Sequence, residues 1–468
     1  MGQATGARLP TKACHMGIVN EDRPDMLTTS METFTVRLVM AALGVGISIL
    51  IARTLGPEGR GAYVYPVVLA SMLITTLHAS LEQANVHLFS GQRYSLADLA
   101  ANSGFVASVA AGISLLVTVV SLGIRPAGVG GVPPAVLLAA LMVVPFNVHQ
   151  IHLTGLLQIT HRMRAVNRVA LVSASVQACA IGIFAMVGRL TVLAVVSIAS
   201  GVGALHWALT ARALGEPTLL LPRCIPELLR RSLRFGLSLH LGLVMVFLQL
   251  RADVFLLERF SGLAAVGLYT LAVVAAESIW MITDAVAVAC LPHQVESSAA
   301  ESGRITLRAC RFNFFLALLA GASLALVSYP AVRLAYGVPF LPAIPALLAL
   351  LPGVVCYSVQ RVCGAYLLRL NHPLRMSGIL GGAVILNIAL NLVWIPRWGI
   401  VGAALASTAS YALSAALFLT WAVRVSGLRL WEAIAWVPED TRTLRRALKI
   451  GPWGWFRRGR QEYTFPRA

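Results

Sequence analysis

The chain has 468 residues, of which 58% are hydrophobic and only 12% are charged. A water-soluble protein of this length could not bury so much apolar surface, so the composition predicts a membrane protein with many spans. The formal net charge of +18 does not indicate a nucleic-acid partner, because the basic residues are spread over short segments between apolar runs. No nucleic-acid binding is therefore expected.

The sequence lacks the residue patterns that several kinds of catalytic or metal site require. The seven cysteines contain no CxxC pair, and most lie in or beside apolar runs, where a thiol behaves as a small hydrophobe. The sequence has no GxxxxGK[ST] phosphate loop and no long polar loop that could house a soluble catalytic domain. His149 and His152 have a metal-compatible i, i+3 spacing, but no third ligand is evident. The chain is therefore predicted not to be an enzyme and to hold neither a metal nor a cofactor.

The first half of the chain contains six apolar runs, each long enough to cross a bilayer at about 20 residues per helix. They follow a polar tail, residues 1–30, which is predicted to be disordered and cytoplasmic. The runs lie at 34–55, 62–87, 99–122, 134–158, 167–187 and 190–213. Together they define a predicted N-lobe over residues 31–214.

A basic, proline-containing segment, residues 215–234, is predicted to be a cytoplasmic linker to a second lobe, residues 235–424. Six further apolar runs lie at 235–257, 264–291, 309–329, 341–368, 376–396 and 399–424. The expected fold is therefore an all-α membrane protein with about 12 transmembrane helices in two six-helix lobes. Residues 425–468 form a basic, tryptophan-rich tail, which suits either an interfacial segment on anionic lipid or a solvated tail that only enforces topology.

A glycine-rich segment between the first two runs recurs in the second half of the chain. The segment RTLGPEGRGAY begins at Arg53; its glycines free the backbone, and its proline stops a helix. Its arginine, two of its glycines and its tyrosine recur in the stretch from Arg259 to Tyr269. The repeat indicates two pseudo-symmetric copies of one unit, each aligned by a hinge. The predicted hinge residues are Gly56, Pro57, Gly59, Gly61, Gly262 and Gly267.

The distribution of positive charge predicts the orientation in the membrane. The loops after even-numbered runs carry twice as many Lys and Arg residues as the loops after odd-numbered runs. Because basic loops stay in the cytoplasm, both termini are predicted to be cytoplasmic. The hinge at Gly56 then lies on the extracytoplasmic side.

Ionisable side chains inside the apolar runs need a partner or a watery cavity, because each costs about 2.5 to 3.5 kcal/mol at the bilayer centre. Arg251 and Asp253 are two residues apart and cannot face each other on a helix, so each is expected to contact a different helix. Glu277 and Asp284 are seven apart and share a face, as do His78 and Glu82. The candidates for substrate binding are Arg251, Arg361, Arg37, Gln360 and Gln249, and those for coupling or charge pairing are Asp253, Glu277, Asp284, Glu82 and His78.

Two interpretations of these residues remain open. In the functional one, Arg37, Arg251 and Arg361 present positive charge to a cavity between the lobes, and the carboxylates pair with them or titrate during transport. In the structural one, the pairs are buried salt bridges that fix helix packing, or the arginines extend from span ends to lipid headgroups. Arg37, close to the cytoplasmic end of its run, suits the latter.

Three stretches resemble the polysaccharide transporter branch of the multidrug/oligosaccharidyl-lipid/polysaccharide (MOP) flippase superfamily. They are RTLGPEGRGAY, LRADVFLLERFSGLAAVGLYTLAVVAAESIW and NIALNLVWIPRWGIVGAALASTASY. The resemblance implies two lobes around a central cavity and transport of lipid-linked oligosaccharides by alternating access. It also matches Arg251, Asp253 and Glu277 to polar positions of the family, and the forked donors of arginine suit a polyprenyl pyrophosphate.

The expected function is a flippase of the bacterial cytoplasmic (inner) membrane that serves exopolysaccharide, O-antigen (lipopolysaccharide) or capsule assembly. Its expected partners are a lipid-linked oligosaccharide, anionic membrane lipid, and a polysaccharide polymerase and glycosyltransferases. One alternative is a multidrug antiporter of the same superfamily driven by Na⁺ or H⁺, for which the intramembrane acids are the motivation. Another is a membrane scaffold for polysaccharide-assembly enzymes, suggested only by the basic tail.

Overall fold

The computed structural model of the chain describes residues 26–90, 94–124, 130–215, 221–281, 283–284, 299–368 and 372–428. Within these ranges the regular structure is helical throughout, as predicted from the sequence. The tail from residue 429 onward, most of residues 1–30 and part of the predicted linker lie outside the described residues.

The helices follow one another along the chain with short connections. The first half forms α1 (Met26–Leu77), α2 (Leu81–Ser90), α3 (Leu96–Ile124), α4 (Pro134–Leu141), α5 (Val144–Ile159), α6 (Met163–Met186) and α7 (Val192–Leu214). The second half forms α8 (Pro226–Glu277), α10 (Ala299–Ala335), the 3₁₀ helix η2 (Val338–Phe340), α11 (Ala343–Leu368) and α12 (Pro373–Ser426).

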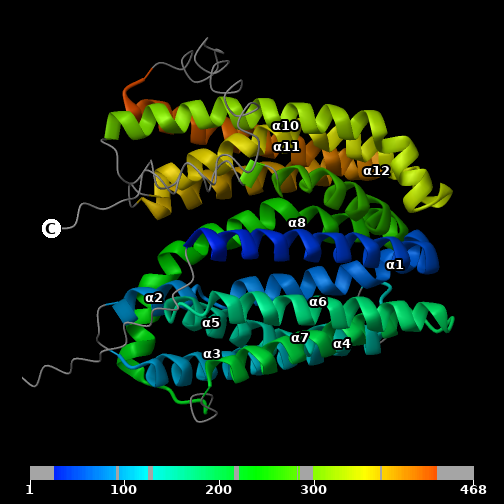
Figure 1. Ribbon diagram of the computed structural model, residues 1–468. Helices are drawn as coiled ribbons and strands as arrows, with labels where there is room; N and C mark the ends of the chain where they lie inside the picture. Colours follow the sequence, from blue (N-terminus) through cyan, green and yellow to red (C-terminus); the bar gives the residue numbers. More distant parts are fainter. Residues whose placement is uncertain are drawn as a thin grey trace, which may run out of the picture.

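Three of the helices are bent at a glycine. The backbone is non-helical at Gly56 in α1 (φ 68°, ψ −176°), at Gly262 in α8 (φ 77°, ψ 178°) and at Gly399 in α12 (φ 56°, ψ −131°). A positive φ favours glycine, which has no Cβ. A straight helix of 52 residues, the length of α1 and of α8, would extend about 78 Å, far beyond the roughly 30 Å hydrocarbon core. Figure 1 shows α1 turning back on itself at this bend, so each bent helix has two arms.

The bends explain how the predicted spans map onto the structure. Runs 34–55 and 62–87 fall on either side of Gly56, and runs 235–257 and 264–291 fall on either side of Gly262. Nine helices in the described ranges are long and apolar enough to cross a membrane, with each bent helix counted once. The membrane-protein class is therefore confirmed, and the count of twelve stays a prediction.

Several element boundaries differ from the sequence-based ones. α1 begins at Met26 and α8 at Pro226, so parts of the predicted tail and linker are helical. Proline suits the first turn of a helix because its missing N–H would have no partner there. Run 62–87 breaks between α1 and α2, where Ala79 and Ser80 both adopt φ 51°. Run 134–158 breaks between α4 and α5, directly before Pro145.

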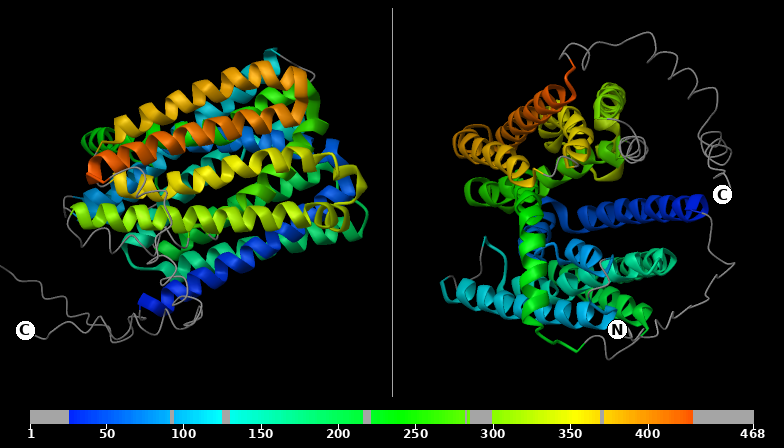
Figure 2. Two further views of the ribbon diagram at one scale, coloured as in Figure 1. Left: turned by 90° about the horizontal axis from the view of Figure 1, so that it is seen from above. Right: turned by 90° about the vertical axis from the view of Figure 1, so that its left-hand side faces the viewer.

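The helices form two bundles. Helices α1 to α7 make the N-terminal bundle and α8, α10, α11 and α12 make the C-terminal bundle, with α1 and α8 facing each other in the middle (Figure 1). The start of α8 crosses from the N-terminal to the C-terminal bundle, as the right-hand view of Figure 2 shows. Leu228 near this start is fully buried in a cluster with Leu153 and Leu156 of α5, so α8 is anchored in both bundles.

The outward faces of the bundles carry large apolar side chains. Leu116 of α3 is 61% exposed, Met186 of α6 is 81% exposed and Leu326 of α10 is 83% exposed. In water such faces would be unfavourable, whereas in a bilayer they meet hydrocarbon. The pattern is that of a multi-pass membrane protein.

The two repeated corners lie directly against each other. A Cβ added to Gly61 would lie 1.8 Å from the carbonyl oxygen of Leu263, and one added to Gly267 would lie 1.9 Å from that of Pro57. The two glycines are equivalent positions of the repeat, so the two copies meet through their backbones. Arg53 strengthens this end, because its guanidinium donates to the carbonyls of Leu334 and Ala335 at the end of α10.

Candidate functional site

Two carboxylates at the end of α8 and just beyond it each bind an arginine of another segment: Glu277 is the last residue of α8, and Asp284 follows seven residues later. Glu277 accepts two hydrogen bonds from Arg251 on the first arm, at 2.6 Å from Nη1 and 2.8 Å from Nη2. Asp284 accepts two from Arg361 on α11, both at 2.6 Å. Such forked pairs combine charge with fixed geometry. The two carboxylates, seven residues apart in the sequence, therefore each hold one arginine near the end of α8.

Aromatic side chains fill the space between the two ion pairs. Trp280 lies between Glu277 and Asp284 in the sequence, just beyond the end of α8, and the Arg361 guanidinium is centred 5.4 Å from its ring. Trp280 also packs on Tyr357, with ring centroids 4.8 Å apart. A cation over an indole face is electrostatically favourable. The pairs and rings form one unit within the C-terminal bundle.

Both arginines keep part of their surface accessible. The Arg251 side chain is 27% exposed and that of Arg361 is 33% exposed, while Glu277 and Asp284 are 18% and 42% exposed. A guanidinium carries five N–H donors, and a forked carboxylate pair occupies only two of them. Arg251 Nη1 also donates to the Leu250 carbonyl at 2.9 Å, and each guanidinium still keeps N–H donors beyond those that the carboxylate uses.

Asp253 lies elsewhere, in a fully buried polar network. Its Oδ2 accepts hydrogen bonds from the hydroxyls of Tyr269 and Ser407, the latter at 2.9 Å. Asn387 on α12 donates to Ser407 at 3.3 Å and accepts from Asn391 at 2.9 Å. The network connects the two arms of α8 to α12. Asp253 makes no hydrogen bond to Arg251 in it.

The two glutamine candidates are buried. Gln249 is fully buried, and its Nε2 donates to Ser410 and Ser414 of α12 at 2.9 to 3.3 Å. Gln360 on α11 is 5% exposed and its Oε1 has no hydrogen-bond partner. Arg37 lies apart from both, on an exposed part of the first arm of α1. The structure thus brings together four of the predicted residues, Arg251, Glu277, Arg361 and Asp284.

His78 and Glu82 belong to the junction between α1 and α2. His78 Nδ1 lies 3.6 Å from the Glu82 carboxylate and accepts from the Ser80 amide at 2.9 Å. The ring of His152 on α5 lies 2.9 Å from the His78 carbonyl, and His240 on α8 lies 2.9 Å from the carbonyl of Thr76. These imidazoles satisfy carbonyls that the helix break leaves open. His240 also ties the C-terminal bundle to this junction.

No group of three metal-binding side chains occurs among the described residues. His149, the other histidine of the i, i+3 pair, accepts a hydrogen bond from Trp207 Nε1 at 3.1 Å. The two histidines therefore have ordinary packing partners. The predicted hinge residues lie at the bends and corners of α1 and α8, and their role in transport stays a prediction.

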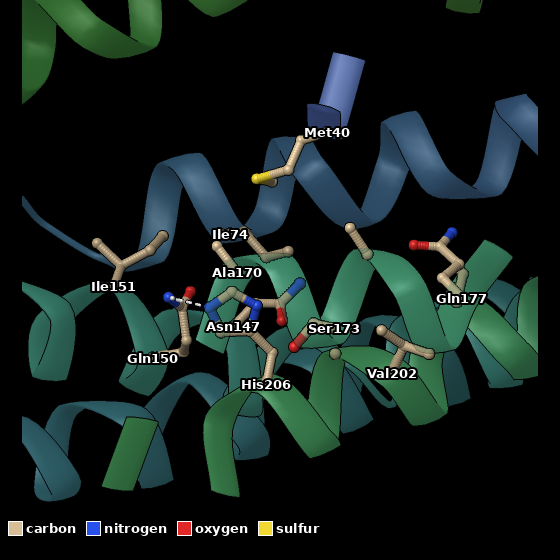
Figure 3. Close-up of a pocket in the computed structure, with 13 residues that line it drawn as sticks. Met40, Ile74, Asn147, Gln150, Ile151, Ala170, Ser173, Gln177, Val202 and His206 are labelled. Atoms are coloured by element: carbon tan, nitrogen blue, oxygen red, sulfur yellow. Dashed lines mark hydrogen bonds between the residues drawn. The ribbon is translucent and has the colours of Figure 1, made fainter. Parts of the chain in front are cut away.

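A cavity of about 340 Å³, open on one side, lies between α1, α5, α6 and α7 of the N-terminal bundle (Figure 3). Its lining contains no Asp, Glu, Lys or Arg. Neutral polar groups line it instead: Asn147, Gln150, Ser173, Gln177 and His206. Gln150 Nε2 lies 3.2 Å from His206 Nε2 and 2.8 Å from Thr154 Oγ1.

This cavity was not predicted from the sequence, because the candidate residues lie in runs that also carry charged residues, whereas the run that forms α5 carries none and the run that forms α6 carries only one, at its start. Asn147 and Gln150 are three apart on α5, and Ser173 and Gln177 are four apart on α6, which is the spacing of one helix face. This spacing could have indicated a polar stripe in each helix. Arg60 was also missed: it lies in the hinge segment, is only 4% exposed and donates to Ser48 Oγ at 2.9 Å.

The model of the polysaccharide biosynthesis protein family matches residues 30–294, more than half of the chain. This match includes Arg251, Glu277 and Asp284, and it stops before Arg361. No curated protein gives a significant sequence match.

Solved structures show the same fold. An inward-facing multidrug resistance MATE family transporter of the MOP superfamily aligns with a TM-score of 0.63 and 14% identity, over 84% of this chain and 98% of that one. Lipid II flippase MurJ in an inward closed conformation aligns with a TM-score of 0.65 and 11% identity, over 87% and 89%. A MOP superfamily transporter from Pyrococcus furiosus aligns with a TM-score of 0.58 and 13% identity, over 86% and 95%. The chain is therefore a member of the polysaccharide biosynthesis protein family with the fold of the MOP superfamily of transporters and flippases.

Proposed function

We propose that the chain is a flippase that carries a polyprenyl-pyrophosphate-linked oligosaccharide across the bacterial cytoplasmic membrane. Family membership supports a role in polysaccharide assembly, and the fold supports transport. The observation that carries the choice of substrate is the presence of two partly exposed arginines, Arg251 and Arg361, each held by a carboxylate within the C-terminal bundle.

The ion pairs suit a reversible anion site. An unpaired cation inside a membrane is costly, so each arginine needs a counter-charge when no substrate is present. Glu277 and Asp284 supply that charge. A pyrophosphate carries more negative charge and more acceptor oxygens than one carboxylate, so it competes for the free guanidinium donors. The carboxylates therefore hold the site ready and yield when the substrate enters.

A multidrug antiporter is less well supported. A cationic drug would need an accessible carboxylate, and Glu277 and Asp284 are both bound to arginine. Asp253 is buried and accepts hydrogen bonds from Tyr269 and Ser407. A scaffold without transport leaves the paired arginines unexplained. Ion-coupled efflux of ethidium from vesicles that contain only this protein would favour the antiporter.

The direction and partners of transport follow from this proposal. With both termini in the cytoplasm, the substrate is loaded where glycosyltransferases build it and is released outside, where a polysaccharide polymerase uses it. The basic loops of the cytoplasmic side attract anionic lipid.

A gene deletion tests the proposal in the cell. Loss of the gene should lower the amount of lipid-linked oligosaccharide at the outer face of the membrane and raise the amount at the inner face. A plasmid copy of the gene should restore the normal distribution. If the lipid-linked oligosaccharide appears at the outer face at the normal rate in the deletion strain, the proposal is wrong.

A further inference from the structure

The cavity between α1, α5, α6 and α7 contains polar groups without protein partners. Ser173 is 3% exposed, and its Oγ has no hydrogen-bond partner. The carboxamides of Asn147 and Gln177 make no hydrogen bond to any described residue. Figure 3 shows Ser173, Asn147 and Gln177 around the same cavity. Of the three, Ser173 is buried and Asn147 and Gln177 are half-buried. A buried hydroxyl without a partner is unfavourable, and the two amides beside it have free hydrogen-bonding groups, so the site suits a polar occupant.

Gln150 and His206 form a fixed part of the same wall. The two N–H groups of Gln150 reach Thr154 Oγ1 and His206 Nε2, which leaves its Oε1 as an acceptor. A neutral imidazole has one donor and one acceptor nitrogen, and His206 uses Nε2 for its contact with Gln150. The cavity therefore offers both donors and acceptors at fixed positions.

The remaining wall is apolar. Met40 and Ile74 come from the two arms of α1, and Ile151 and Val202 come from α5 and α7. A pyranose ring has matching surfaces, because its hydroxyls both donate and accept while its C–H groups are apolar. Amide side chains suit such hydroxyls since each carries two donors and an acceptor oxygen.

Other ligand classes fit this lining less well. A phosphate or a carboxylate would need cationic donors, which the lining lacks. A cationic drug would need a carboxylate or an exposed aromatic face, and neither lines the cavity. A lipid chain would leave the side chains of Asn147, Ser173 and Gln177 without partners.

We propose that this cavity binds one neutral sugar residue of the transported glycan. The assignment rests on the proposed function in identifying the sugar as part of the cargo. It divides recognition between the bundles: the C-terminal bundle takes the pyrophosphate at Arg251 and Arg361, and the N-terminal bundle takes an uncharged sugar.

The test measures binding of free sugars to the full-length protein in lipid nanodiscs. Sugar-based detergents are avoided because their headgroups would compete. The probes are glucose, galactose, rhamnose and N-acetylglucosamine. Binding of each sugar is measured by saturation-transfer NMR and by equilibrium dialysis with the radiolabelled sugar. Inorganic pyrophosphate, followed by equilibrium dialysis alone, serves as the charged comparison. We expect saturable binding of at least one sugar that pyrophosphate does not displace.

Variants locate the site. Gln177→Leu and Ser173→Ala each remove one hydrogen-bonding group, so sugar binding should weaken about fivefold to tenfold in each. Gln158→Leu is the matched control, because Gln158 lies on α5 like Gln150 but is exposed and outside the cavity. Thermal melting of each variant checks that the fold is retained.

The outcomes separate this inference from the proposed function. Absence of binding for every sugar, or equal binding by Gln177→Leu, Ser173→Ala and wild type, would overturn the sugar site even if flipping is normal. Sugar binding that depends on Gln177 and Ser173 would support the site even if the lipid-linked oligosaccharide is not flipped. Displacement of the sugar by pyrophosphate would count against the division between the bundles.

Discussion

At the scale of single residues, Arg251 and Arg361 have a structural role that the ion pairs show and a substrate-binding role that we propose. Each makes two short hydrogen bonds to one carboxylate, so each contributes to helix packing. Each is also partly exposed, with donors left over. One arginine can therefore both fix helix packing and bind substrate, which are the two interpretations that the sequence left open. Variants are needed to separate these two roles.

A charge-neutral double variant separates packing from anion binding. Arg251→Gln alone leaves Glu277 without its partner, which should cost about 1 to 3 kcal/mol of stability. Arg251→Gln with Glu277→Gln keeps a polar pair of similar size and removes both charges. We expect the double variant to melt close to wild type and yet to lose most transport, because the cation is gone.

Melting curves and translocation rates in proteoliposomes measure the two effects. Arg251→Lys should retain some transport as a point charge without the forked geometry. If the neutral double variant transports at the wild-type rate, Arg251 contributes only to helix packing and does not bind the substrate.

Asp253 is assigned to structure by its surroundings. Asp253→Asn keeps an oxygen that can accept from Tyr269 and Ser407, so transport should stay within about threefold of wild type. Asp253→Ala leaves the hydroxyls of Tyr269 and Ser407 without their acceptor and should lower stability by about 1 to 3 kcal/mol. Translocation rate and thermal melting measure these effects. Loss of transport in a stably folded Asp253→Asn protein would instead indicate that this carboxyl titrates during the cycle.

Spacing along one helix could be predicted from sequence, but partners on other helices could not. The shared face of Glu277 and Asp284 and the separation of Arg251 from Asp253 follow from helical geometry. The choice of Arg361 for Asp284 depends on how the segment after α8 packs against α11, which no local pattern encodes. Gln177 was not predicted because it lies in an apolar run without a charged neighbour, where a single amide is inexpensive and common.

At the scale of elements, the bends of α1 and α8 determine how the two bundles meet. Repetition in the sequence located the corners, since Gly56 and Gly262 are equivalent and both have positive φ. The contact of the two corners with each other was not evident, because it depends on the symmetry between the bundles. Gly61 and Gly267 allow this contact, since a Cβ on either would overlap a backbone carbonyl.

A single methyl group at a corner should therefore force the bundles apart. Gly61→Ala and Gly267→Ala should each lower stability by at least about 1 to 3 kcal/mol, the usual cost of overpacking, and impair transport. Gly46→Ala is the matched control on α1, because nothing lies within 4 Å of its added Cβ. Thermal melting and translocation rate measure the effect. Wild-type behaviour of Gly61→Ala would show that the corner contact is not required.

At the scale of the whole molecule, the bundles are joined at two places. The corners of α1 and α8 meet at one, and the start of α8 is anchored in the N-terminal bundle at the other. The proposed flippase would work by alternating access, in which the bundles move relative to each other, and such a motion would require the segment of α8 between Leu228 and His240 to bend or slide. His240 marks this connection, since it lies 2.9 Å from the carbonyl of Thr76.

The two bundles also differ in chemistry. The C-terminal bundle holds the forked arginine pairs, and the N-terminal bundle holds an uncharged polar cavity. A substrate with a charged and a neutral part suits this difference better than a simple cation does. Composition and periodicity predicted the membrane class and the two halves, whereas this division needed the packed structure.

Reconstitution with a defined substrate tests the central claim most directly. The purified protein is placed in liposomes with a polyprenyl-pyrophosphate-linked oligosaccharide, and translocation is followed by the accessibility of the glycan to an impermeant glycosidase. We predict that the protein speeds translocation above that in empty liposomes, and that the Arg251→Gln, Glu277→Gln double variant does not. A rate equal to that of empty liposomes, with folded protein in the membrane, would contradict the account.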